Sequence, residues 1–205
     1  ANPKYETLMR WVEQVRRTAN PFLLAVGGGS VIDGTKFIAA AAPFEGREPW
    51  DILAEQAPIH SAVPMGALLT LPATGSEMNN GAVISRLQTK EKLVFQNDLV
   101  YPQFAVMDPL YTFSLPHHQS ANGIVDAWVH VLEQYTTFDV NTPLQDRQAE
   151  AVLGTLLLEG PKVLAEADAY EARANVMWAA TNALNRLLSC GIVSDWATHL
   201  IGHEI

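Results

Sequence analysis

The chain has 205 residues, of which 48% are hydrophobic and 17% charged, and this composition supports a buried core and argues against disorder. Its formal net charge of −9 repels phosphate backbones, so nucleic acid is not an expected partner. The single cysteine, Cys190, excludes an internal disulfide and favours a cytoplasmic location, and no apolar run reaches the roughly 18–20 residues that a membrane span needs.

The first hundred residues alternate between helical and strand-like patterns. Apolar residues at helical spacing predict a helix over 4–18, and the alanine-rich segment 31–42 predicts another. Between them, the continuous apolar run 22–26 is typical of a parallel strand buried on both faces. Helix, strand, glycine turn and helix form half of a doubly wound α/β arrangement. Further strands are expected over 63–71, 82–85, 93–95 and 104–107.

The pattern changes after about residue 113, where long stretches of good helix formers replace the strands. We place a domain boundary near Ser114, which gives an α/β domain over 1–114 and an all-α domain over 115–205. Helices are expected over 117–137, 143–159, 168–189 and from 194 onward. The chain opens in turn chemistry and closes inside a predicted helix, so we expect both ends to lie within a larger fold.

A run of glycines, Gly27-Gly28-Gly29-Ser30, connects the first predicted strand to the next helix. Glycines let backbone amides approach an anion closely, and the helix N-terminus adds partial positive charge. The run therefore indicates a phosphate cradle, with a tight strand-to-helix turn as the alternative. Asp33, one turn further on, is a candidate for capping this loop or for contacting ligand hydroxyls.

Two hydroxyl side chains mark the end of the predicted strand 63–71: Thr70 lies within its last residues, and Thr74 follows it beside Gly75. Such hydroxyls can reach phosphate oxygens or a ring amide, but they bond the local backbone more often. Lys92 is a candidate counter-charge for a phosphate, although most single lysines are solvated.

Two pairs of polar side chains in the second half have i, i+4 spacing, which places each pair on one helix face. Asp126 and His130 form one pair, and His199 and His203 the other. A carboxylate with neutral imidazoles suits divalent Zn or Fe, whereas a satisfied Asp–His pair within a helix is the alternative. Glu204 follows the last histidine, so the order differs from His-Glu-x-x-His and disfavours a metalloprotease.

Taken together, these segments resemble the iron-containing (group III) alcohol dehydrogenases, and the branch most similar is that of the bacterial NADPH-dependent aldehyde reductases and butanol dehydrogenases. The resemblance covers essentially the whole chain. Its matching segments are residues 25–36, 71–77, 123–130 and 196–199, with His203.

The resemblance implies a Rossmann-like dinucleotide-binding α/β domain followed by a helical metal-binding domain, each partial in this chain, with the active site in the cleft between them. It assigns the metal to Asp126, His130 and His199, with a fourth histidine beyond Ile205, and places His203 near the metal as a candidate proton relay. It assigns the cofactor, NADP or NAD, to Asn2, Gly28, Gly29, Ser30, Asp33, Thr70, Thr74 and Lys92.

The expected activity is a metal-dependent, NAD(P)-linked interconversion of alcohols and aldehydes by hydride transfer, with Zn or Fe as the metal. The expected partners are a small alcohol or aldehyde substrate and a second copy of the chain in a homodimer. An inactive fragment of such an enzyme is the rival interpretation, and little dehydrogenase activity is expected of these 205 residues alone. A glycerol dehydrogenase-like or dehydroquinate synthase-like relative is a further alternative, against which the Asp126–His130 pair argues.

Overall fold

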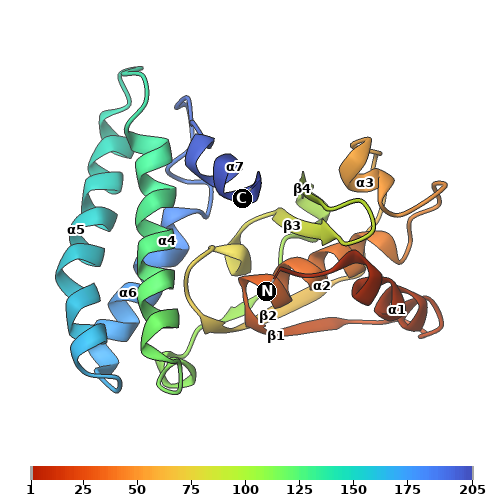
Figure 1. Ribbon diagram of the computed structural model, residues 1–205, viewed down its shortest axis with the longest axis horizontal. Coiled ribbons are helices and arrows are strands. Elements are labelled where there is room, and N and C mark those ends of the chain that lie inside the picture. Colours follow the sequence, from red (N-terminus) through yellow and green to blue (C-terminus); the bar gives the residue numbers. More distant parts are fainter. Residues whose placement is uncertain (1, 205) are drawn as a thin grey trace. The chain divides into compact units, whose positions relative to one another are not determined.

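The computed structural model describes residues 2–204, with side chains as far as residue 202, and it divides into two compact units (Figure 1). An α/β unit comprises the residues up to 69 together with 76–106. A helical unit comprises 70–75 and the residues from 107 onward. The predicted fold class, α/β followed by all-α, is confirmed. Among the described helices, none has the length and apolar character needed to cross a membrane.

The α/β unit is built on a three-stranded sheet in the order β1-β2-β5, and a β3–β4 hairpin forms a second, antiparallel sheet. Strand β2 runs parallel to β5, with Ala67 opposite Ala105 and Leu68 opposite Val106. The elements are α1 (Tyr5–Arg16), β1 (Leu23–Gly28), α2 (Gly29–Ala41), α3 (Asp51–Ala54), β2 (Met65–Leu71), β3 (Gly81–Arg86), β4 (Glu91–Gln96) and β5 (Ala105–Val106).

Helices α1, α2 and α3 pack with the hairpin around one hydrophobic core. Burial of each large side chain in such a core removes apolar surface from water and contributes roughly 1.5–3 kcal/mol. The largest contributors include Tyr5, Val12, Phe37, Trp50, Ile84 and Phe95. Tyr5 contacts the rings of both Phe37 and Trp50 edge-on, which fixes how α1 lies on α2.

The expectation that the first strand is buried on both faces is wrong for the described chain. Ala25 is buried, but Leu24 and Val26 are each 55% exposed on the opposite face of β1. Successive strand residues point to opposite faces, and helix packing covers only one of them. A continuous apolar run therefore cannot by itself show that both faces are covered.

A buried ionic cluster ties α2 to the hairpin and to the segment just before it. Lys36 has no exposed surface, and its ammonium donates to Asn79 Oδ1 and to the Gly81 carbonyl, both at 2.8 Å. One carboxylate oxygen of Asp33 accepts from the Ser76 hydroxyl at 2.7 Å, and the other accepts from the Val83 amide at 2.9 Å. Both charges are thus hydrogen-bonded inside the unit, as buried charges must be.

The helical unit consists of four α-helices in the described residues, and the two long ones run side by side (Figure 1). Small residues at the helix contacts, such as Ala127 and Ala180, let the helices approach closely around a core that includes Val131, Leu156 and Val176. The helices are α4 (His117–Tyr135), α5 (Pro143–Ala165), α6 (Tyr170–Ala183) and α7 (Ala197–Glu204).

Two predicted helix ends differ from the structure. The helix predicted over 168–189 ends at Ala183, because side-chain amides there bond the backbone: Asn182 donates to the Trp178 carbonyl and Asn185 accepts from the Leu187 amide. The helix predicted to stop at residue 159 continues through Pro161 to Ala165.

Candidate metal centre

Helix α4 presents Asp126 and His130 on one face, one turn apart, as their spacing predicts. Ala127 and Val131, the residues that follow them, are completely buried in the core of the helical unit. This packing fixes the rotation of α4 about its axis. The His130 side chain is consequently buried, and that of Asp126 is partly exposed.

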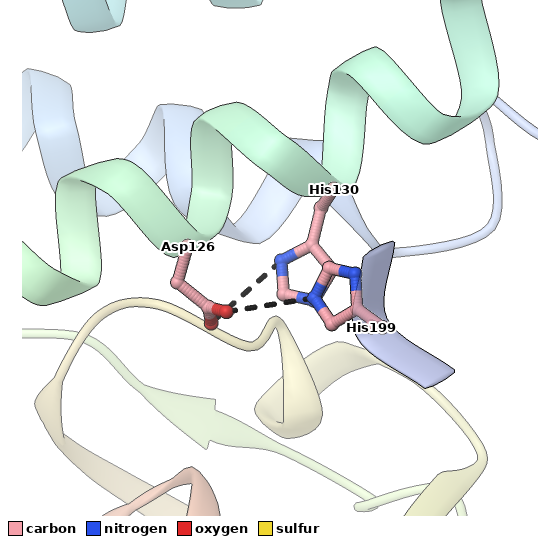
Figure 2. Close-up of side chains that lie close together, drawn as sticks. All are labelled: Asp126, His130 and His199. Carbon is pink, nitrogen blue, oxygen red and sulfur yellow. Dashed lines mark ion pairs between the residues drawn. The ribbon is translucent and has the colours of Figure 1, made fainter. Parts of the chain in front are cut away.

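Helix α7 brings His199 to the same place. Its ring stacks on that of His130, with centroids 4.4 Å apart and planes 18° apart. Trp196, just before α7, contacts both imidazole rings edge-on. Residues distant in sequence are thus joined in one cluster, shown in Figure 2.

The three side chains offer ligand atoms that all lie within 4.8 Å of one another. Asp126 Oδ1 lies 3.6 Å from His199 Nε2, and Asp126 Oδ2 lies 3.8 Å from His130 Nδ1 (Figure 2). Ligands at about 2.0–2.2 Å from a tetrahedral ion lie about 3.3–3.6 Å from each other. The two spacings that include Asp126 are therefore close to those of a coordinated ion.

The two imidazoles have opposite electrostatic environments. Burial lowers the pKa of His130, although the nearby Asp126 carboxylate and a hydrogen bond with the Ala73 backbone oppose this. Polar contact with Asp126 raises the pKa of His199 against its desolvation, and Glu133 adds to the increase. His130 is therefore held as the neutral base that a metal requires.

One ring nitrogen of the cluster lacks a hydrogen bond. Among the described residues, buried His130 Nδ1 has no hydrogen-bond partner, and it is directed toward the Asp126 carboxylate. An unpaired buried polar atom costs about 1–3 kcal/mol. A divalent cation between this nitrogen, the Asp126 carboxylate and His199 would satisfy it, so the side chains fit a Zn or Fe(II) ion.

A glycine lets the segment 70–75 approach α4 at the cluster. A β-carbon added to Gly123 would lie 2.5 Å from the Pro72 carbonyl oxygen, far inside normal contact. Gly75 has a φ of +60°, the left-handed conformation that favours glycine. These two glycines allow the turn to lie close to α4, with Ala73 beside His130.

An open cavity of about 270 Å³ adjoins Asp126. Its walls combine apolar Leu71 and Ala73 with the amide side chains of Gln119 and Asn122. The space suits a small molecule with an apolar part and a polar group.

The residues predicted to bind a cofactor are divided between the two units. Asn2, Gly28, Gly29, Ser30, Asp33 and Lys92 lie in the α/β unit, and Thr70 and Thr74 lie in the helical unit. Strand β1 continues to Gly28, and α2 begins at Gly29, so the glycine run provides the first amides of the helix. Asp33 is buried and uses both oxygens within the protein. Burial raises its pKa against the effect of Lys36.

His203, the predicted catalytic residue, lies on α7 one turn after His199, but its side chain is outside the described residues. Its role stays a prediction.

A buried carboxylate next to the cluster, Glu133, is not among the residues predicted from the sequence. It contacts His199 from α4, one turn after His130. The spacing 126, 130, 133 places it on the same helix face, and that spacing is the signal that could have identified it.

Comparison with known proteins identifies the class to which this fold and site belong. The family model for iron-containing alcohol dehydrogenases matches residues 1–109, and the model for the C-terminal part of the Fe-containing alcohol dehydrogenases matches residues 120–205. The chain belongs to the iron-containing alcohol dehydrogenase family. The resemblance found from the sequence is therefore confirmed.

Individual relatives agree with this assignment. The chain is 59% identical to the NADPH-dependent aldehyde reductase YqhD of Escherichia coli, over all of this chain and 53% of that protein. It is 45% identical to the probable NADH-dependent butanol dehydrogenase 1 of Bacillus subtilis, over 100% of this chain and 52% of that protein. The chain thus spans about half the length of these curated relatives.

Solved structures show the same fold. The crystal structure of Escherichia coli YqhD matches with a TM-score of 0.96 and 58% identity, over 99% of this chain and 53% of that one. The NADH-dependent butanol dehydrogenase A of Thermotoga maritima matches with a TM-score of 0.93 and 37% identity, over 98% and 50%.

Replacing Asp126 by Ala should abolish stoichiometric binding of a divalent metal by the intact protein, because it removes the only carboxylate in the described ligand set. Elemental analysis after dialysis measures the effect. The control is Glu150→Ala, which removes an exposed carboxylate that accepts from the Tyr135 hydroxyl on the same unit. Unchanged metal content in Asp126→Ala would show that the assignment is wrong.

Replacing Gly123 by Ala should destabilise the helical unit by about 1–3 kcal/mol, because the new methyl group collides with the Pro72 carbonyl. Gly154→Ala on α5 is the matched control: its methyl group meets nothing within 4 Å, and it should stabilise the helix by up to about 1 kcal/mol. Urea unfolding compares the two. Equal stability of both variants would contradict the proposed close approach.

Proposed function

We propose that the protein is a metal-dependent, NAD(P)-linked oxidoreductase that interconverts small alcohols and aldehydes. The observation that supports this most directly is the cluster of Asp126, His130 and His199 beside a cavity. Family membership and the activities named for the relatives agree with it.

The helical unit provides the metal ligands and the adjoining space. Asp126 and the two imidazoles would hold a divalent ion, Zn or Fe(II), which would supply Lewis-acid polarisation of the substrate oxygen. The apolar wall of Leu71 and Ala73 would accommodate the alkyl part of the substrate and limit the entry of water. His203, one turn after His199, is the proposed proton relay.

The α/β unit provides the start of α2 as a cradle for the cofactor pyrophosphate. The first amides of a helix have no partner within the helix and carry partial positive charge. Gly28 and Gly29 would let phosphate oxygens reach those amides, and Ser30 is exposed beside them. NADP or NAD would supply the hydride. The remaining proposed contacts are Asn2, Thr70, Thr74 and Lys92. The carboxylate oxygens of Asp33 both accept hydrogen bonds within the α/β unit, so this residue would support the loop rather than contact the cofactor.

A homodimer and a cytoplasmic location stay predictions. Size-exclusion chromatography with light scattering would test the first.

The intact protein should oxidise NADPH or NADH when butanal is supplied, and the absorbance at 340 nm follows this reaction. Removal of the metal with a chelator should stop turnover, and added Zn or Fe(II) should restore it, which also compares the two metals. No turnover of any short aldehyde with either cofactor would refute the proposed function. Full turnover of metal-free protein would refute the role of the metal.

Replacing Gly29 by Val should raise the dissociation constant of NADPH more than tenfold, equivalent to about 1.4 kcal/mol. The valine side chain would crowd the approaching phosphate. Backbone strain is not the cause, because within residues 2–204 the glycines with positive φ are Gly75 and Gly191, and Gly29 adopts a backbone that other residues can also adopt. Thr35→Val, in the same helix, removes only an internal bond to the Val31 carbonyl and serves as the control. Fluorescence titration measures both. Equal NADPH affinity in the two folded variants would contradict the cradle.

A further inference from the structure

Glu133 is a buried carboxylate to which the proposed function gives no role. It lies on α4, one turn after His130, and its side chain is 8% exposed. Taking a carboxylate out of water is costly unless hydrogen bonds compensate it. Its partners therefore indicate what it does.

All the described partners of this carboxylate belong to the first turn of α7. Oε1 accepts from the backbone amides of Thr198 at 2.6 Å and His199 at 3.2 Å. Oε2 accepts from His199 Nδ1. In addition, the Glu133 backbone carbonyl accepts from the Asp195 amide at 2.8 Å. One residue of α4 thus holds both the backbone and the side chain of a metal ligand.

The bond to Nδ1 determines which nitrogen of His199 is available. A neutral imidazole carries one proton, so the nitrogen that donates to a carboxylate leaves the other with a free lone pair. A proton on Nδ1 leaves the lone pair on Nε2, the nitrogen that faces Asp126 Oδ1 at 3.6 Å. The contact therefore selects the tautomer that a metal ion needs.

We propose that Glu133 is a positioning residue of the metal centre: it orients the His199 ring, fixes its tautomer and docks the start of α7 on α4. This inference rests on the proposed metal site. A purely structural role, in which Glu133 only caps α7, would also explain the two backbone amides. It does not require the bond to Nδ1, and this difference makes the two roles separable.

The test is Glu133→Gln in the intact protein. An amide of the same size must either present its NH₂ to Nδ1, which favours the wrong tautomer, or present it to the two backbone amides of α7. The dissociation constant for Zn, measured by competition with a chromophoric chelator, should rise about 10- to 100-fold. Nitrogen NMR of the histidine rings in metal-free protein at alkaline pH should show His199 protonated at Nδ1 in the wild type and altered in the variant.

Two further variants separate positioning from stability. Gln134→Met removes a neighbouring buried side chain that donates to the backbone carbonyls of His130 and Ala183, at 2.6 and 2.8 Å. It should lower the melting temperature and leave the Zn dissociation constant within twofold. Glu133→Asp keeps the charge on a shorter side chain, so its Zn affinity should lie between those of the wild type and Glu133→Gln.

A folded Glu133→Gln protein with wild-type Zn affinity and an unchanged tautomer would overturn the inference. If that variant does not fold, two other results would overturn the inference equally. One is wild-type His199 protonated at Nε2, and the other is a Glu133→Asp protein that binds Zn no more weakly than Gln134→Met. Failure of the wild type itself to bind Zn or Fe(II) would instead count against the proposed metal centre.

Discussion

The helical unit depends on one face of α4, where ionisable side chains lie against the protein interior. Asp126, His130 and Glu133 follow one another at spacings of four and three residues, so all three point the same way. A face of this kind is stable only if other elements compensate it. Helix α7 compensates this face with the His199 side chain and with the backbone amides of its first turn. The turn after β2 compensates it with the Ala73 backbone, which forms a hydrogen bond with His130. The polar face and the start of α7 thus fix each other's position.

Small residues make this arrangement possible. Gly123 admits the Pro72 carbonyl against α4, and Ala127 lies in a core with Ala180 and Ala183 of α6. Each of these positions brings a backbone closer than a larger side chain would allow. Helix α4 is therefore packed closely against both the 70–75 segment and α6, which keeps Asp126 and His130 in register for a common ligand. A centre whose ligands are positioned before the metal arrives loses less conformational entropy on binding.

The sequence predicted what local periodicity determines and missed what tertiary contacts determine. Spacing alone placed Asp126 and His130 on one face, and composition separated the α/β part from the helical part. No period relates His199 to α4, so that link came only from resemblance. A glutamate in a helix is usually solvated, so its residue type alone does not single out Glu133. The early end of α6 depends on side-chain amides of Asn182 and Asn185 that compete with the helix backbone, a choice that helix propensity does not reveal.

Two buried ionic clusters show how a scaffold can be told from a site. In the α/β unit, the Lys36 ammonium and both Asp33 oxygens have hydrogen bonds within the protein, so the cluster is complete and its charges serve the fold. In the helical unit, Glu133 is fully engaged, yet the adjacent His130 Nδ1 is buried with no hydrogen bond from the part of the chain that the structure describes. Evolution tolerates an unsatisfied buried atom rarely, because it costs stability. The incomplete cluster, with its nitrogen and oxygen donors, is therefore the one that fits a bound cation.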